Sequence, residues 1–328
     1  MLASHVRRTG LALLTVFLMQ PFNPTAAEEL PAAIKAADAK YLAVPDVTPK
    51  DDSAKIEAGG GEDEGAKPRP REIEKDAVKA ALTYRAVDSE GETFFAPTIT
   101  VFAGGKEVAK FAQSDDEAFP SPYLSIQIAE LDPGNAHPEV VVSFYTGGAH
   151  CCSDTSVITS SKDGLAWTTV DVGQFDGSPL TAVDIDGDGR YEFETRDNAF
   201  LYAFACYACS EAPLEVLALE DGAMKNVTAE PRYEKAHEAY LKAMIENAPD
   251  EDVNGFLAGY VGEKSLLGEG KAAWDLMLAH YDKSSDWGLD HCDQPLDDGG
   301  ECPGKVETLA FPDALERMLN ENGYTIRD

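Results

Sequence analysis

A short run of alternating acidic residues is the part of this sequence best suited to chemistry. It reads Asp184-Ile-Asp186-Gly-Asp188-Gly-Arg190-Tyr-Glu192. Carboxylates at alternate positions can fold around one hard cation, and the glycines between them let the backbone turn tightly. Calcium suits such a loop better than magnesium, because magnesium demands a near-octahedral shell. We therefore expect a calcium loop, to which Arg190 would contribute its carbonyl oxygen, with a solvated Asp/Gly turn as the alternative.

The residues that follow the loop distinguish it from an EF-hand. The twelfth position of an EF-hand is a bidentate acid, whereas Thr195 stands there. The segment 191–194 alternates apolar and polar residues, as a strand does. The loop thus resembles the calcium loops of FG-GAP and VCBS repeats, found in integrin-α-like propellers and exported bacterial proteins. This resemblance implies blade-like sheets, a structural calcium ion, and four side-chain ligands: Asp184, Asp186, Asp188 and Glu192.

The start of the chain predicts export. Residues 1–27 have a basic beginning, an apolar run and small residues before an expected cleavage after Ala27, which is the layout of a secretory signal peptide. The apolar run is shorter than the ~20 residues that a membrane helix needs. We therefore expect a periplasmic or secreted protein with no membrane insertion after cleavage. The net charge of -32 at pH 7 excludes nucleic acid as a main partner.

A weak internal repeat organises the middle of the chain. The segment 130–142 matches 184–194 if one residue is inserted, and both copies continue through a strand to two cysteines, another strand and a turn. The first copy lacks the central Asp-Gly-Asp-Gly, so we expect it to be a turn without bound metal.

The six cysteines are expected to form disulfides, because the compartment beyond the cytoplasmic membrane is oxidising. Cys292 and Cys302 bracket their own Gly-rich loop and are expected to bond to each other. The other four occupy corresponding places in the two repeats, which should pack side by side. Cross-repeat disulfides are therefore predicted among Cys151, Cys152, Cys206 and Cys209.

Two alternative chemistries compete with the calcium loop. His150 beside Cys151 and Cys152, with Cys206 and Cys209 in the corresponding place of the second repeat, could hold zinc or copper in a periplasmic metal-handling protein. The Cys206-x-x-Cys209 spacing could instead form a redox pair in a thiol-handling protein. A hydrolase is the weaker alternative, because the sequence has neither a nucleophile elbow nor His-Glu-x-x-His. A pocket for it could be lined by residues next to the cystine-bracketed loop, but ordinary loop residues are the preferred interpretation of this group: Asp286, Trp287, Asp290 and His291.

The elements that position these residues fall into three parts after the signal peptide. Residues 28–71 are poor in large apolar groups and predict a flexible acidic linker, with only a marginal helix at 32–41. Residues 72–230 predict short antiparallel strands. Residues 231–328 predict helices over 233–245, 253–261 and 274–281, and a last one opening at Phe311. The expected strands are 98–102, 108–111, 124–128, 139–145, 155–159, 167–172, 191–194, 200–205, 214–219 and 224–228.

Together these features predict an exported α+β protein. An antiparallel β-module of two blade-like repeats, with one calcium ion, precedes a small helical C-terminal subdomain. No catalytic residue or organic cofactor is assigned. The expected role is non-catalytic, either binding an envelope protein or glycan or supporting structure at the cell envelope.

Overall fold

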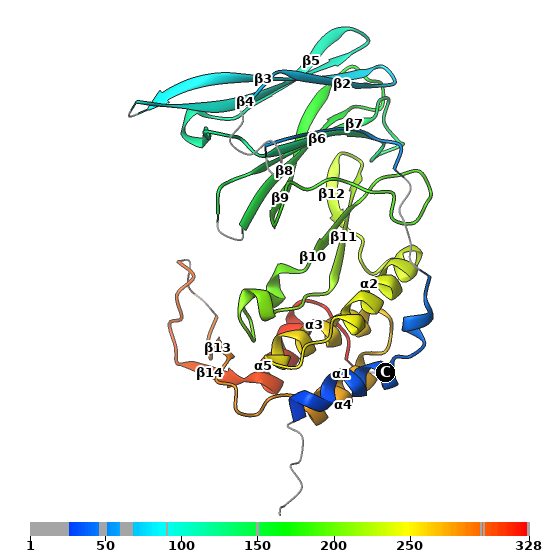
Figure 1. Ribbon diagram of the computed structural model, residues 1–328, viewed down its shortest axis with the longest axis vertical. Helices are drawn as coiled ribbons and strands as arrows, with labels where there is room; N and C mark the ends of the chain where they lie inside the picture. Colours follow the sequence, from blue (N-terminus) through cyan, green and yellow to red (C-terminus); the bar gives the residue numbers. More distant parts are fainter. Residues whose placement is uncertain are drawn as a thin grey trace, which may run out of the picture.

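The computed structural model describes residues 26–45, 51–59, 68–89, 91–148, 151–295, 297 and 299–326. The expected signal peptide lies outside this part of the chain, apart from Ala26 and Ala27, and His150 lies outside it altogether. Antiparallel sheets gather at one end of the molecule and helices at the other, with a small sheet between them (Figure 1). The fold is therefore mixed α+β, as predicted.

Two sheets form the end of the molecule farthest from the helices. A four-stranded meander consists of β2 (Arg71–Lys75), β3 (Val78–Ser89), β4 (Glu92–Ala103) and β5 (Lys106–Ala112). A five-stranded sheet has the order β1-β6-β7-β8-β9. Its strands are β1 (Ala54–Ala58), β6 (Leu124–Ala129), β7 (Glu139–Tyr145), β8 (Cys151–Ser160) and β9 (Trp167–Asp176).

The five-stranded sheet is the middle layer. One face packs on the meander through alternate residues such as Ile126 and Ile128, as the two-residue period of strands requires. They share a core with Val78 and Leu82 of β3. The other face packs through Val141 and Val157 on the segment that carries the acidic loop. Because both faces are covered, β6 and most of β7 are continuously buried.

A smaller sheet leads from this sandwich to the helices. It contains β10 (Phe193–Arg196), β11 (Leu214–Glu220) and β12 (Ala223–Asn226). The helices are α1 (Ala26–Ala37), α2 (Glu234–Glu246), α3 (Val253–Leu266), α4 (Gly270–His280) and α5 (Phe311–Glu321). The four C-terminal helices match the expected ones. A hairpin of β13 (Gly288–Cys292) and β14 (Val306–Ala310), which the sequence analysis missed, precedes α5.

The α3 helix is the centre of the helical part. It is buried along most of its length, and its glycines let other chain segments approach its backbone. A Cβ atom at Gly259 would lie 2.5 Å from the carbonyl oxygen of Glu211. The segment 198–212 therefore packs directly on α3.

The expectation of a flexible linker over residues 28–71 is wrong for two of its segments. Leu30 and Ile34 of α1 are fully buried among the helices, and Ile56 of β1 belongs to the core of the sandwich. The i, i+4 spacing of Leu30 and Ile34 places both on one helix face. These few apolar residues are sufficient because they are buried against cores built mainly by the rest of the chain.

The expected strand at 200–205 is also wrong. A 3₁₀ turn, η4 (Asn198–Phe200), opens this region, and the chain continues through further turns. Phe200 and Phe204 are buried in the helical core, not in a sheet. A short apolar run is compatible with a buried turn as well as with a strand.

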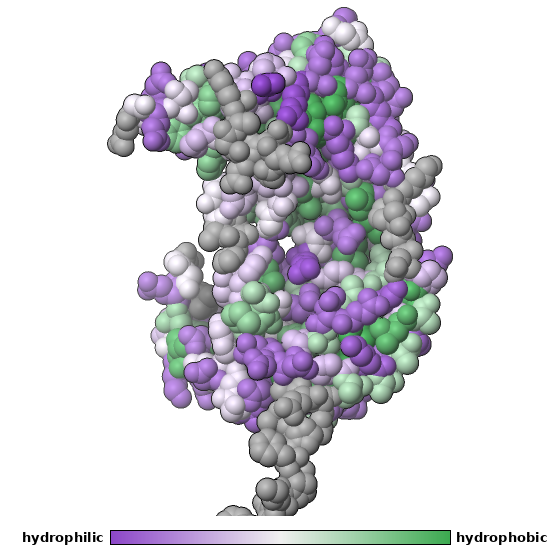
Figure 2. Space-filling model, viewed as in Figure 1, coloured by the Kyte–Doolittle hydropathy of each residue, from purple (hydrophilic) through white to green (hydrophobic). Residues whose placement is uncertain are grey.

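One face of the molecule is mainly polar (Figure 2). Figure 2 shows mainly hydrophilic residues on one face and an indentation between the sheet-rich and helix-rich parts. No helix within the described part of the chain has the length and apolar character needed to cross a membrane.

Candidate metal centre in the acidic loop

The acidic loop is closed at its base by a single bridge between Val183 and Glu192. The amide of each residue donates to the carbonyl of the other at 2.8 Å. Gly187 and Gly189 have φ angles of 80° and 94°, in the left-handed region that glycine adopts without steric cost. The chain therefore reverses tightly before it enters β10.

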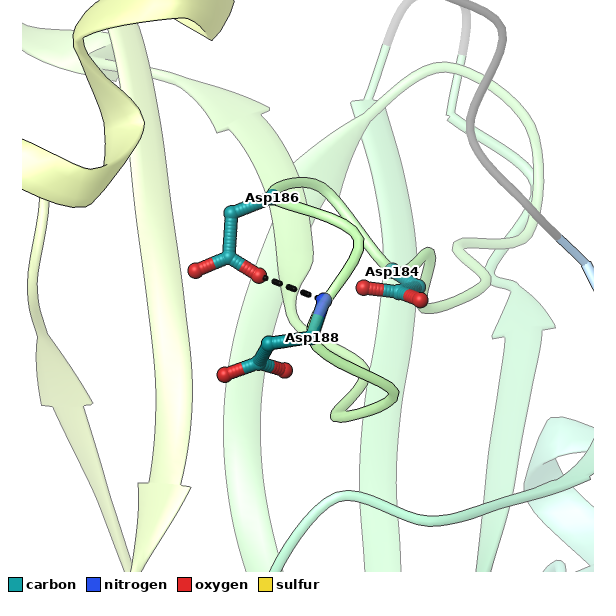
Figure 3. Close-up of side chains that lie close together, drawn as sticks. All are labelled: Asp184, Asp186 and Asp188. Carbon is teal, nitrogen blue, oxygen red and sulfur yellow. Dashed lines mark hydrogen bonds between the residues drawn. The ribbon is translucent and has the colours of Figure 1, made fainter.

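Three carboxylates converge inside this reversal. One ligand oxygen from each of Asp184, Asp186 and Asp188 lies within 4.8 Å of the others, and Figure 3 shows the side chains around a common space. The loop's amides hold them: Asp188 N donates to Asp186 Oδ1 at 3.1 Å, and Gly189 N to Asp184 Oδ2 at 3.2 Å. Arg190 N donates to Asp188 Oδ1 at 2.8 Å. Oxygen ligands in this irregular arrangement suit calcium.

Two buried carboxylate oxygens at this loop receive no well-aligned hydrogen bond from the described residues, although the Tyr233 hydroxyl interacts with the Glu192 carboxylate. They are Asp184 Oδ1 and Glu192 Oε1, on side chains that are 3% and 0% exposed. The second oxygen of Glu192 accepts from Ile185 N at 3.3 Å. The pKa of Glu192 is raised to about 7, mainly by burial. The hydrogen bond from Ile185 N opposes this rise, and the negative charge of Asp186 adds to it. A buried carboxylate without compensation is costly, and a cation would relieve that cost.

The loop before β7 is a contrasting arrangement within the same chain. Glu139 pairs with Ala129 across the strands, as Glu192 pairs with Val183. Both oxygens of the buried Glu139 have donors within the protein. Leu131 N and Asp132 N donate to Oε2 at 2.7 and 3.1 Å, whereas Thr159 Oγ1, at 2.9 Å, and Asn135 Nδ2 donate to Oε1. The carboxylate of this loop is thus satisfied by neutral groups of the chain.

The two arginines near the acidic loop have different roles. The guanidinium of Arg190 donates to the carbonyl oxygens of Leu131 and Leu219 at 3.0 and 2.7 Å, and pairs with Glu220. This side chain therefore fastens the loop to its neighbours. Arg232 instead faces the carboxylates, with Nε 4.0 Å from Asp186 Oδ2 and a terminal nitrogen 3.8 Å from Asp188 Oδ2. Sequence reasoning missed Arg232 because no local pattern connects it with the loop.

The disulfides correct one expectation and agree with another. Cys206 is bonded to Cys209, not to the first repeat, because the 3₁₀ turn η5 (Tyr207–Cys209) brings their Cα atoms within 4.9 Å. Cys292 is bonded to Cys302, the pairing expected from the sequence. Cys152 is disulfide-bonded as well. These five cysteines therefore offer no free thiolate for a metal or for thiol chemistry.

The residues suggested for a hydrolase lie near the exposed hairpin of β13 and β14. Asp290 accepts from Thr308 across that hairpin at 2.7 Å, and His291 lies 2.8 Å from a guanidinium nitrogen of Arg317. Trp287 is 41% exposed. Asp290 and His291 thus make separate contacts, each with a residue outside the suggested set.

Comparison with known proteins relates the chain to a cyanobacterial protein. The "Probable thylakoid lumen protein sll0997" of Synechocystis sp. is 39% identical over 257 residues, which cover 77% of this chain and 75% of the relative. The chain belongs to the sll0997 family. A match to the sll0997 C-terminal domain covers residues 233–323, which include α2 to α5.

A second relative matches this chain over a smaller share of its own length. The "Uncharacterized protein y4bJ" of Sinorhizobium fredii is 34% identical over 242 residues, covering 72% of this chain but only 38% of that protein. No solved structure matches the chain. The sll0997 relative is named for an exported compartment, and this protein is extracytoplasmic, periplasmic or secreted, as its sequence predicts.

Proposed function

We propose that this sll0997-family protein is an extracytoplasmic calcium-binding protein in which the ion has a structural, non-catalytic role. The observation that carries the proposal is the buried, unpartnered Oδ1 of Asp184 within a group of three converging aspartates, with the buried carboxylate of Glu192 beside it. Asp184, Asp186, Asp188 and Glu192 would supply side-chain oxygens, and Arg190 its carbonyl oxygen. The ion would stiffen the loop and fix the start of β10.

The contrast with the loop of Glu139 supports this proposal. Asn135 donates an amide hydrogen to Glu139, whereas the corresponding residue of the acidic loop is Asp188, whose carboxylate cannot donate to Glu192 in this way. We read the two loops as copies of one repeat, in which a neutral amide serves the first and a cation serves the second. The resemblance to FG-GAP and VCBS calcium loops, and blade-like packing of the two copies, belong to this proposal.

Titration of calcium into chelator-treated mature protein tests the site. We expect one saturable binding event by isothermal titration calorimetry in the parent and none after Asp186 and Asp188 are both changed to Ala, because two of the converging oxygens are then lost. Asp163→Ala is the matched control. It removes a carboxylate from another Asp-Gly turn, where Asp163 accepts from Ser161 and Leu165, and should leave binding unchanged. Absence of binding by the parent would refute the proposal.

A pocket near the loop is the place where we propose that a glycan of the cell envelope binds. The cavity of about 500 Å³ lies beside the end of β9, β10 and the segment held by the Cys206–Cys209 bond. Its lining combines an aromatic ring with charged and amide side chains, which is the combination that holds sugar rings and their hydroxyl groups. These residues include Asp176, Glu194, Arg196, Asn198 and Tyr207.

A glycan array probed with the labelled parent and with Tyr207→Ala tests this assignment. We expect defined glycans to retain the parent and to lose the variant, because the ring supplies the stacking surface. Leu165→Ala, at a side chain that is 86% exposed and outside this pocket, is the control and should behave as the parent. Equal retention of the parent and Tyr207→Ala would remove the pocket from the proposal.

A further inference from the structure

Arg232 stands at the junction between the β-module and the helical part. It belongs to the 3₁₀ turn η6 (Pro231–Tyr233), which leads directly into α2, and the match to the C-terminal domain begins at the next residue. Its side chain is 29% exposed, and its Nε lies 2.9 Å from Glu230 Oε2. The guanidinium thus has a close partner of its own outside the acidic loop.

The same guanidinium opposes the charge of the acidic loop. It lies 4.0 Å from an oxygen of Asp186 and 3.8 Å from an oxygen of Asp188, which are ion-pair distances without the closer approach of a hydrogen bond. The other arginine of the loop, Arg190, is engaged with carbonyl oxygens and Glu220. Arg232 is therefore placed to screen these aspartates when no ion is present.

A divalent ion among the aspartates would change this balance. Like charges a few ångströms apart repel strongly where solvent is partly excluded. The oxygens that attract Arg232 would be committed to the ion, and Glu230 would remain as the alternative partner of the guanidinium. Binding of the ion and approach of Arg232 thus oppose each other.

Tyr233 extends this arrangement into the helical part. Its side chain is fully buried, and its hydroxyl interacts with the carboxylate of Glu192 in the acidic loop. The ring lies under the Arg232 guanidinium at 4.8 Å. Burial and the nearby charge of Glu192 raise the pKa of this hydroxyl. A shift of Arg232 would therefore reach the residue that directly precedes α2.

We infer that Arg232 is an internal counter-cation that competes with calcium for Asp186 and Asp188, and that it couples occupancy of the loop to the start of α2. This inference rests on the proposed calcium site. Because coupling is reciprocal, weakening the hold of Arg232 must tighten calcium binding. Arg232 is a positioning residue here and not a ligand.

Calorimetric titration of the chelator-treated protein with calcium tests the competition. Arg232→Gln keeps a polar side chain but removes the charge, and should lower the Kd about tenfold, which corresponds to about 1.4 kcal/mol. Arg317→Gln removes the same charge from an exposed pair with Glu321 on α5, and should leave the Kd unchanged. Binding by the parent with the same Kd in Arg232→Gln would overturn the competition alone. No binding by the parent would overturn the calcium site as well.

Amide hydrogen exchange tests the coupling to α2. Calcium should change the exchange of peptides spanning 231–240 in the parent and in Arg317→Gln. In Arg232→Gln, calcium should still protect the loop at 184–192 but no longer alter 231–240. An identical response of 231–240 in the parent and Arg232→Gln would show that the loop acts on α2 by another route.

Discussion

Nδ1 of His237 lies 2.7 Å from Oε1 of Glu263, and both side chains are buried. The other ring nitrogen lies 2.9 Å from the carbonyl oxygen of Thr228, and the second carboxylate oxygen of Glu263 accepts from Leu214 N. One buried hydrogen-bonded pair therefore connects α2, α3 and the sheet of β11. Burial lowers the pKa of His237, but the contacts with Glu263 and Thr228 raise it overall.

Breaking this pair should weaken the attachment of the small sheet to the helices. Glu263→Ala leaves a buried imidazole without its acid and should cost on the order of 3–5 kcal/mol in the free energy of unfolding. Glu234→Gln, at an exposed residue of α2, should cost little. Urea unfolding followed by circular dichroism measures both. Equal midpoints for Glu263→Ala and Glu234→Gln would show that the pair is not a stabilising link.

The N-terminal segment should detach when Asp38 is changed. Its carboxylate is 2% exposed and lies 2.5 Å from both the Lys264 ammonium and the Tyr260 hydroxyl. Asp38→Ala removes one of the two carboxylates that pair with the buried Lys264, the other being Glu269, and also the acceptor of the Tyr260 hydroxyl, and should cost about 3 kcal/mol. Limited proteolysis should then cleave near residue 40 faster than in the parent.

A surface pair is the control for this change. Asp275→Ala breaks the Lys271–Asp275 pair, whose side chains are 49% and 60% exposed, and should cost less than about 1 kcal/mol because water screens the charges. If Asp38→Ala and Asp275→Ala were cleaved equally slowly, α1 would be held by its apolar contacts alone.

Sequence patterns located the acidic loop because its candidate ligands are close together in the chain. Asp184, Asp186 and Asp188 converge through local hydrogen bonds, so their spacing alone carries the prediction. Arg232 escaped prediction because it approaches the loop only after β10 to β12 have folded back. A sequence contains no local signal for such an encounter.

The secondary-structure elements that the sequence predicted are those with local causes, and the ones it did not predict depend on long-range contacts. The periodicity of α2 to α5 is strong and predicted them, as it did most strands from β4 onward. The α1 helix depends on docking of Leu30 and Ile34, so its composition resembled a linker. The Cys206–Cys209 bond depends on a one-turn 3₁₀ helix, which the correspondence between the two repeats does not reveal.

Glu139 should make stability decrease as the pH rises. Burial raises its pKa to about 7 in spite of donors from Asn135, Leu131, Asp132 and Thr159. A pKa above the ordinary value of 4.5 means that the folded state holds the proton more tightly. This contribution is fully present below pH 4.5 and is lost as the pH rises through about 7. The free energy of unfolding that is lost over this pH range is on the order of 3 kcal/mol.

Glu139→Gln isolates this effect, because other groups with raised pKa values, such as Glu215, add to the slope of the parent. Unfolding free energies measured in chelator between about pH 5 and pH 8 should fall less steeply in Glu139→Gln. Glu74→Gln, at an exposed residue of β2, should keep the slope of the parent. Parallel curves for all three proteins would exclude Glu139 as the titrating group.

Calcium should reverse the stability order of the parent and the loop variant. With free calcium at about 100 times its Kd, binding adds about 2.7 kcal/mol to the parent, because the ion binds the folded state. The double variant Asp186→Ala, Asp188→Ala gains nothing from calcium. In chelator, however, it lacks two of the clustered like charges, so it should melt at or above the Tm of the parent. Differential scanning calorimetry in calcium and in chelator measures the crossing. A variant that melts below the parent by the same margin in both conditions would show that these aspartates stabilise the loop without an ion.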